Sequence, residues 1–317
     1  MYQTKISSLF KACTAPVPTA TRAPEDDYQF VDCFCGIGGA STGATLAGLR
    51  VVLAVDSDKR MLGVHELNHP DATHMNIELP PQRPLPLPKA AKWHLHGSPP
   101  CTEVSCINML ATPEQRKHGL GLVRWYLRYA LASGATSFSM EQVPASSVLK
   151  VVKRFRRKHP GKIDYCVVNC WDLGVPQTRK RLIAGTPMLI DKLRRRRAVR
   201  RSVEDVIADP GGTHTRIETT ASGPVTRRNA NCWNSFCRPI SRPAATVTAS
   251  HGLRWANPGS GVKPVTMGSR DLLLLQSFPE DYKLRGLSNT VARRGIGNGL
   301  PPRAMCELLR PLGGGGK

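Results

Sequence analysis

The chain has 317 residues, of which 40% are hydrophobic, and it carries 45 Lys and Arg against 23 Asp and Glu. This size suits one large domain with a smaller one, and no apolar run reaches the roughly 18 residues of a membrane span. The net charge of +22 indicates a polyanionic partner, with nucleic acid as the first candidate. We therefore expect a globular nucleic-acid-binding protein and exclude a membrane-spanning one.

The ten cysteines are scattered along the chain, and no secretory signal accompanies them. Neither Cys33 with Cys35 nor Cys232 with Cys237 has the spacing of zinc ligands. We therefore expect reduced thiols, no metal and an intracellular protein. A nucleic-acid partner would place it in the nucleus or nucleoid.

Residues 1–27 are rich in Thr, Ser, Pro and Ala and have no acid before Glu25, which predicts a flexible tail. Gln3, Ile6 and Phe10 resemble the anchors of the short motif that docks on a PCNA-like sliding clamp, although Leu9 stands where an aromatic is usual. The same basic start also resembles an organelle transit peptide, and a tail without a partner is the third interpretation.

The ordered core begins with a buried strand over residues 30–34, followed by a glycine turn at 36–39 and a helix of small residues over 40–49. A second strand over 51–55 ends at Asp56, twenty residues after Gly36. In nucleotide-binding folds an acid at this place accepts hydrogen bonds from ribose hydroxyls. The arrangement predicts a site for a nucleoside-containing cofactor.

A helix over 61–68, a third strand ending at Asn76 and a proline-rich connection over 80–88 come next. The strand predicted at 92–96 then leads into Gly97-Ser-Pro-Pro-Cys101. Two consecutive prolines stiffen this loop, so it can hold the Cys101 thiol in one position. We interpret Cys101 as a candidate nucleophile.

Beyond a helix predicted at 120–133, a strand over 135–140 ends at Glu141. Parallel strands meet at their carboxyl ends, so the thiol and the Glu141 carboxyl are expected in one cleft. After a further strand at 165–169, Arg179 and Arg181 alternate along the chain, which puts both on one face of a strand. We expect both to face that cleft; a cross-strand ion pair is the alternative, more natural for one arginine than for two beside so few acids.

From Pro187 to about Ser241 the regular alternation of strands and helices is lost, and Arg, Thr, Asn and Gly become frequent. Residues 150–203 hold 17 basic side chains against three acids, although 150–158 taken alone is typical of a solvated helix face. An edge strand over 241–248 and helices over 271–278 and 303–309 complete the prediction.

These changes of pattern divide the chain into five segments. We predict a tail at 1–27, a catalytic and cofactor-binding domain at 28–186, a target-recognition domain at 187–286, a returning C-terminal segment at 287–312 and a tail at 313–317.

In order and residue content, seven motifs resemble those of the cytosine carbon-5 DNA methyltransferase family. They are Phe30 to Gly39, Asp56, Gly97 to Cys101, Glu141 to Pro144, Gln177 to Arg181, Arg242 to Thr246 and Gly297 to Pro302. The resemblance implies an α/β fold with a Rossmann-like S-adenosylmethionine-dependent domain and a smaller, irregular, strand-rich recognition domain. It also implies a monomer that acts on double-stranded DNA.

The resemblance assigns residues to three roles. The catalytic residues it implies are Cys101, Glu141, Arg179 and Arg181. The residues it implies for S-adenosylmethionine are Phe34, Gly36, Gly38, Gly39, Asp56, Asn76, Pro99 and Asn298. The residues it implies for the nucleic acid are Ser105, Gln177, Arg242 and Thr246.

Two departures from the family pattern concern the supporting residues. Gln142 stands where the family usually has Asn, and Asn76 stands where it often has Asp. Two rival functions remain: a tRNA cytosine methyltransferase of the same family and a catalytically inactive DNA-binding paralogue. The intact Cys101 and Glu141 favour an active enzyme, and nothing in the sequence indicates the target sequence.

Overall fold

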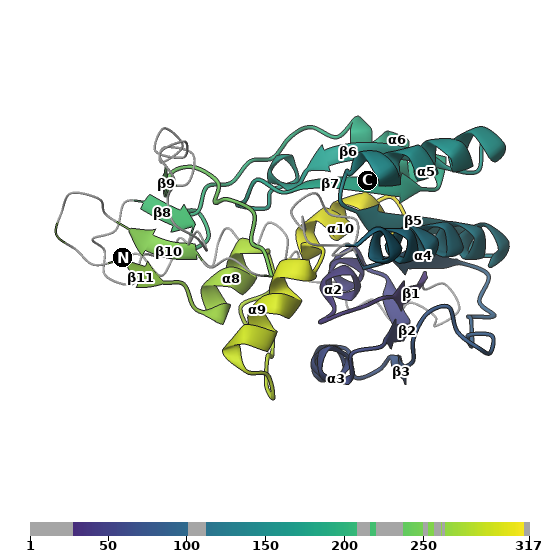
Figure 1. Cartoon of the computed structure of the whole chain (residues 1–317), viewed down its shortest axis with the longest axis horizontal. Coiled ribbons are helices and arrows are strands. Elements are labelled where there is room, and N and C mark those ends of the chain that lie inside the picture. Colours follow the sequence, from purple (N-terminus) through teal and green to yellow (C-terminus); the bar gives the residue numbers. More distant parts are fainter. Residues whose placement is uncertain are drawn as a thin grey trace.

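The computed structural model describes residues 28–100, 112–207, 216–219, 237–249, 253–256, 261 and 264–313. Within these ranges a large domain is built on a seven-stranded sheet and a small domain on a four-stranded sheet (Figure 1). The predicted α/β class with a smaller strand-rich domain is confirmed.

The large sheet has the strand order β3-β2-β1-β4-β5-β7-β6, in which β7 runs antiparallel to the other six strands. Its strands are β1 (Gln29–Cys33), β2 (Arg50–Asp56), β3 (Thr73–Asn76), β4 (Trp93–Gly97), β5 (Ser137–Gln142), β6 (Asp164–Asn169) and β7 (Lys180–Gly185). Helices cover both faces of this sheet, so its central strands read as continuous buried runs.

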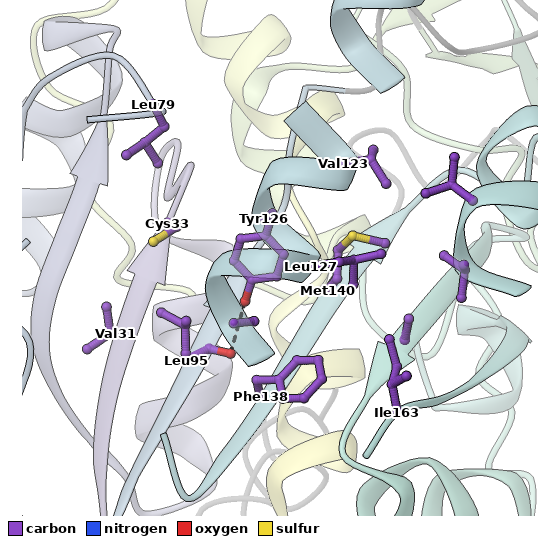
Figure 2. Packing of buried hydrophobic residues seen from close by; sticks show 14 of the residues in the cluster. Val31, Cys33, Leu79, Leu95, Val123, Tyr126, Leu127, Phe138, Met140 and Ile163 are labelled. Carbon is purple, nitrogen blue, oxygen red and sulfur yellow. Dashed lines mark hydrogen bonds between the residues drawn. The ribbon is translucent and has the colours of Figure 1, made fainter. Parts of the chain in front are cut away.

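Two groups of helices cover the two faces of the large sheet. The first group is α4 (Pro113–Ala132) and α5 (Ser146–Lys158), whose apolar sides share a core with β1, β4 and β5 (Figure 2). The second group is α2 (Gly39–Leu46), α6 (Pro187–Arg194) and α10 (Pro302–Leu309). The helix α3 (Lys59–Asn68) follows β2, and a short 3-10 turn, η2 (Cys170–Asp172), follows β6.

Tyr126 on α4 fixes the end of β4, from which the Pro-Pro loop leaves the sheet. Its hydroxyl donates to the carbonyls of Leu95 (3.1 Å, drawn in Figure 2) and Ser139 (2.8 Å). A Cβ added to Gly97 would lie 2.1 Å from the Tyr126 ring, so only glycine fits there. The loop therefore starts from a rigid point.

The small residues of α2 allow α10 to pack very closely against it. A Cβ added to Gly39 would lie 2.2 Å from the Leu300 carbonyl oxygen, and one added to Gly43 would lie 2.4 Å from that of Pro302. The C-terminal segment thus packs against α2, the first helix of the large domain, as Figure 1 shows for α10 beside α2.

The small domain has an antiparallel sheet in the order β11-β10-β8-β9, together with two helices near the large domain. These elements are β8 (Arg216–Thr219), β9 (Cys237–Pro239), β10 (Leu253–Ala256), β11 (Val265–Thr266), α8 (Ser269–Leu275) and α9 (Asn289–Asn298). Buried Trp255 and Phe278 belong to one apolar cluster with Ile37 of the glycine turn and Met61 of α3. The small domain therefore packs directly against the glycine turn and α3.

Several predicted boundaries are wrong. The helix expected from Leu120 begins at Pro113, where Thr112 and Gln115 form a capping box. The irregular region expected from Pro187 begins later, because its first eight residues form α6.

Other differences concern strands. Glu141 lies within β5 rather than after it. No strand forms over 241–248, where only Ala244 makes an isolated bridge to Gln177. The predicted helix over 271–278 is observed at Ser269–Leu275.

In the described ranges, no helix has the length and apolar character needed to cross a membrane. Five cysteines in the described part of the chain are buried and form no disulfide: Cys33, Cys35, Cys166, Cys170 and Cys306.

Candidate functional site

A cavity of about 230 Å³ lies where the carboxyl ends of the central strands meet the glycine turn and α9. The glycine turn contributes Phe34, Gly36 and Gly39, and β2 ends there at Asp56. The other lining residues that the sequence singled out are Pro99, Glu141 and Asn298. The structure thus brings six of the eight predicted cofactor residues to one cavity, together with Glu141.

The glycine turn is held open by its backbone conformation and by Asp56. Gly36 and Phe34 both have positive φ, 53° and 60°, which is uncommon for a residue with a side chain. The Gly36 N–H donates to Oδ2 of Asp56 at 2.8 Å, and the Asp58 N–H donates to Oδ1 at 2.8 Å. Burial raises the pKa of Asp56. Asp56 therefore braces the turn and still lines the cavity.

Two predicted cofactor residues do not line the cavity. Gly38 precedes α2 in the left-handed conformation, and a Cβ on it would lie 2.8 Å from the Tyr282 hydroxyl. The Asn76 side-chain amide donates to the carbonyls of Asp56 and Ser57, both at 3.0 Å. Asn76 therefore supports the turn after β2, and the structure gives no cavity contact for it.

The loop that leads to Cys101 is anchored at three points before it leaves the described residues. The Ser98 N–H donates to the Cys33 carbonyl at 3.2 Å, and its hydroxyl lies 2.9 Å from Nε2 of His96. The Gln142 amide donates to the Pro99 carbonyl at 2.9 Å. Gln142, a departure from the family pattern, therefore ties the end of β5 to the loop.

Glu141 and Arg181 form a buried ion pair at the cavity. Arg181 Nε lies 2.6 Å from Glu141 Oε1, and both side chains are about nine-tenths buried. Arg181 also donates through Nη1 to the Lys180 carbonyl at 2.8 Å. The pair orients one carboxylate oxygen of Glu141 and fixes the carboxylate at the cavity wall.

Arg179 is not among the residues that line the cavity, and Arg181 reaches it only through Glu141, so the two arginines do not face the cavity together as expected. The fully buried guanidinium of Arg179 donates to the carbonyls of Val247, Gly297 and Gly299, each at 2.9 Å. The residue precedes β7 and is drawn to the carboxyl end of α9, where carbonyl groups lack helical partners. Arg179 joins the two domains.

The residues predicted to contact nucleic acid have mixed placements. Gln177 is fully buried and bonds with Leu275, Gln276 and Val247, which makes it another contact between the domains. Thr246 donates to the Thr178 carbonyl, whereas the Arg242 side chain is exposed.

Cys101 and Ser105 lie outside the described residues, as do Gln3, Ile6 and Phe10. Their roles in catalysis, substrate binding and clamp docking stay predictions. A clamp pull-down in which Ile6→Ala and Phe10→Ala remove binding would support the docking motif.

A chain of polar contacts that was not predicted from the sequence runs to the cavity. We call it the histidine relay and define it as His74, His65, Ser41 and Asp32. The Ser41 hydroxyl donates to Asp32 Oδ2 at 2.7 Å, His65 Nε2 lies 2.9 Å from Ser41 Oγ, and His74 Nε2 lies 2.8 Å from His65 Nδ1. Burial lowers the pKa of His65 well below its usual value, so its ring is neutral and has one donor and one acceptor.

The direction of this relay follows from Ser41. Because its only hydrogen goes to Asp32, Ser41 must accept from His65 Nε2–H, and His65 Nδ1 must then accept from His74 Nε2–H. Every donor points toward the Asp32 carboxylate. The sequence signal for this relay was Asp32, a charged residue inside the otherwise apolar strand β1.

Asp32 is fully buried and lines the cavity, and its Oδ1 has no hydrogen-bond partner among the described residues. Burial raises the pKa of Asp32 to about 7, while the Ser41 hydrogen bond opposes that rise. An orphaned carboxylate oxygen suits a ligand with a positive charge or a donor at this end. No cluster of residues that would hold a metal ion occurs in the described part of the chain.

Comparisons with known proteins agree with this geometry. Residues 28–186 match the family model of C-5 cytosine-specific DNA methylase. The type II methyltransferase M.HgiDI of Herpetosiphon aurantiacus is 26% identical over 86% of this chain and 89% of its own length. The type II methyltransferase M.XorII of Xanthomonas oryzae is 31% identical over 48% of this chain, and the match spans only 39% of that relative.

A structural comparison shows the fold. An E. coli structure titled as a prophage-encoded DNA modification methyltransferase superposes with a TM-score of 0.62 and 15% identity. The superposition covers 90% of this chain and 98% of that one.

Proposed function

Because the chain belongs to the C-5 cytosine-specific DNA methylase family, we propose that it transfers a methyl group from S-adenosylmethionine to carbon 5 of cytosine in duplex DNA. One observation carries the proposal: a single cavity is lined by the glycine turn, by Asp56, by Glu141 and by the Pro99-Pro100 loop that leads to Cys101. Cofactor-binding groups and the groups expected to act on the base thus share one space.

The residues present fit S-adenosylmethionine. The Phe34 ring offers a face for a purine, and Asp56 has lone pairs left for ribose hydroxyls after bracing the turn. Asp32 offers its orphaned Oδ1 to a positively charged group. When bound, the cofactor supplies an electrophilic methyl group on a sulfonium.

The remaining residues explain how a poorly nucleophilic carbon is activated. We expect the Cys101 thiolate to add to carbon 6 of the ring, which leaves electron density on carbon 5. Glu141, held by Arg181, is placed to accept a hydrogen bond from the exocyclic amine and, when it carries a proton, to donate that proton to the ring nitrogen as the ring becomes an enamine. Once carbon 5 carries the methyl group, loss of its proton to a base restores the ring double bond and lets the Cys101 sulfur leave.

The base must leave the stacked duplex before it can enter such a cavity. The chain's net charge of +22 favours binding to the phosphates of the opened DNA. We therefore assign base recognition to the small domain and chemistry to the large one.

The test uses labelled S-adenosylmethionine with duplex DNA, with a tRNA transcript and without nucleic acid. Label transfer to duplex DNA is expected, whereas transfer only to tRNA would replace this proposal with the RNA-modifying alternative. Transfer to neither would favour the inactive DNA-binding paralogue.

A trapping experiment tests the nucleophile separately. The protein should form a covalent adduct with duplex DNA containing 5-azacytosine, and Cys101→Ala should abolish it. The matched control is Cys106→Ala, five residues along the same segment, which should keep the adduct. An adduct that survives in Cys101→Ala would identify another nucleophile.

A further inference from the structure

One face of α5 carries a row of four basic residues that the proposed chemistry does not use. Lys150, Lys153, Arg154 and Arg157 follow each other at helical spacings of three, one and three residues, and all four are exposed. Because residues three and four apart share a face, they form one continuous row, which we call the α5 stripe. The opposite side of the helix is buried through Val148, Val151 and Val152.

Nothing in the described part of the chain neutralises the α5 stripe. The helix contains no Asp or Glu, and no acid among the described residues forms an ion pair with any of the four cations. Lys150 with Arg154 and Lys153 with Arg157 are like-charged pairs four residues apart, an arrangement that destabilises a helix. An ordinary solvated helix face interleaves both signs of charge.

The amino end of α5 offers no compensation. Its N-cap is Ala145, which has no capping side chain, and its first turn holds no acid. The helix is therefore held by apolar packing while its exposed side accumulates positive charge. Such a surface suits a partner that supplies the negative charge.

The stripe lies on a larger basic edge of the large domain. The neighbouring edge strand β6 carries Asp164, but this carboxylate is already occupied by Arg156 at 3.1 Å and Arg194 at 2.9 Å. Lys192 and Arg197, in and just beyond α6, add further exposed cations. The α5 stripe therefore faces solvent with a surplus of positive charge around it.

The position of α5 connects the stripe to the cavity rim. Only Val143 to Ala145 separate the end of β5, which carries Glu141, from the start of the helix. From there α5 runs along the outer side of the large domain, beside α4 (Figure 1). At about 1.5 Å per residue, Lys150 and Arg157 are about 10 Å apart along the axis.

We propose that the α5 stripe binds the phosphate backbone of duplex DNA in a segment flanking the bases at the cavity. Duplex DNA presents one negative charge about every 1.7 Å along its axis, so a length of about 10 Å matches the stripe with several phosphates. The stripe has long cationic side chains and no exposed apolar or aromatic anchor, a composition suited to sequence-independent backbone contacts. The choice of duplex DNA over another polyanion rests on the proposed function.

The test variant replaces Lys150, Lys153, Arg154 and Arg157 with Gln together. The matched control replaces Arg50, Arg83, Lys89 and Lys92 with Gln, which removes the same charge from exposed positions at the start of β2 and in the connection between β3 and β4. Circular dichroism and thermal melting check that both variants fold.

Fluorescence anisotropy then measures affinity for labelled duplexes of about 12 and about 40 base pairs across a salt series. For the long duplex, the stripe variant should bind at least about tenfold more weakly at low salt, and the slope of log K against log salt should become shallower by about 3. The short duplex should bind the stripe variant and the parent protein alike, and the control should keep the parent's slope.

Three results would overturn the proposal: an unchanged slope in the stripe variant, an equal loss in the control, or an equal loss for the short and the long duplex. The adduct with the short 5-azacytosine duplex separates this proposal from the proposed function. That adduct should form normally in the stripe variant, and its absence from the parent protein would refute the function while the length-dependent binding still tests the stripe.

Discussion

Replacing Arg179 with Met should destabilise the protein, because it removes hydrogen bonds that join the two domains. The side chain would keep its apolar stem but lose the guanidinium that donates to Val247, Gly297 and Gly299. The Gly299 carbonyl would keep the Gln276 amide at 3.3 Å, so two buried carbonyls would lose this donor.

The size of the effect follows from these two carbonyls. An unsatisfied buried acceptor costs about 1–3 kcal/mol, so we expect a loss of about 4 kcal/mol in the free energy of unfolding. Unfolding entropy near about 2.1 cal/mol/K per residue gives about 0.67 kcal/mol/K for 317 residues. The melting temperature should therefore fall by about 6 °C.

Differential scanning fluorimetry measures this shift directly. Arg60→Met is the control, because Arg60 makes a surface ion pair with Asp58 and is 56% exposed, so its loss should shift Tm by about 1 °C or less. The Tm of Arg179→Lys should lie between those of the parent and Arg179→Met, since one ammonium group cannot reach all three carbonyls. A Tm for Arg179→Met within about 1 °C of the parent would refute the clamp between the domains.

Three further predictions concern the cavity and its supports. Gln142→Leu removes the donor that ties the loop to β5, so adduct formation with 5-azacytosine DNA should slow roughly tenfold while cofactor affinity measured by calorimetry stays unchanged; an unchanged rate would contradict this. Gly39→Ala places a Cβ 2.2 Å from the Leu300 carbonyl oxygen and should abolish cofactor binding. In the control Gly63→Ala the added Cβ has no atom within 4 Å, so this variant should melt at or slightly above the parent temperature. Because burial raises the pKa of Asp32 from 3.8 to about 7, the stability contributed by its neutral form is lost as pH rises through 7. Asp32→Asn should therefore gain about 3 kcal/mol of stability relative to the parent between pH 5 and pH 8, as followed by thermal melting; parallel pH profiles would refute the assignment.

Much of the large domain could be predicted from sequence because its signals are local. Buried apolar runs mark the parallel strands, and the turn after β1 is marked by its glycines. The meeting of Asp56, Pro99 and Glu141 followed from one rule, that parallel strands bring their carboxyl ends to one edge.

The errors arose where local signals were weak or misread. The first turns of α4 are polar and exposed, so hydrophobic periodicity missed them, although Thr112, Pro113 and Gln115 form a recognisable start. Alternation of Arg179 and Arg181 said nothing about their partners. Arg179 bonds with backbone carbonyls up to 120 residues away, and carbonyls leave no mark in a sequence.

The contacts that close the glycine turn have a consequence for how the protein folds during synthesis. The Ile37 carbonyl accepts from Tyr282, 245 residues later, and Gly39 packs against the Leu300 backbone. Chains fold from the amino end as the ribosome extends them, and contacts of such long sequence separation form slowly. The glycine turn therefore stays incomplete until Tyr282 and Leu300 have been synthesised, and a chain truncated before Tyr282 would lack both contacts that close it.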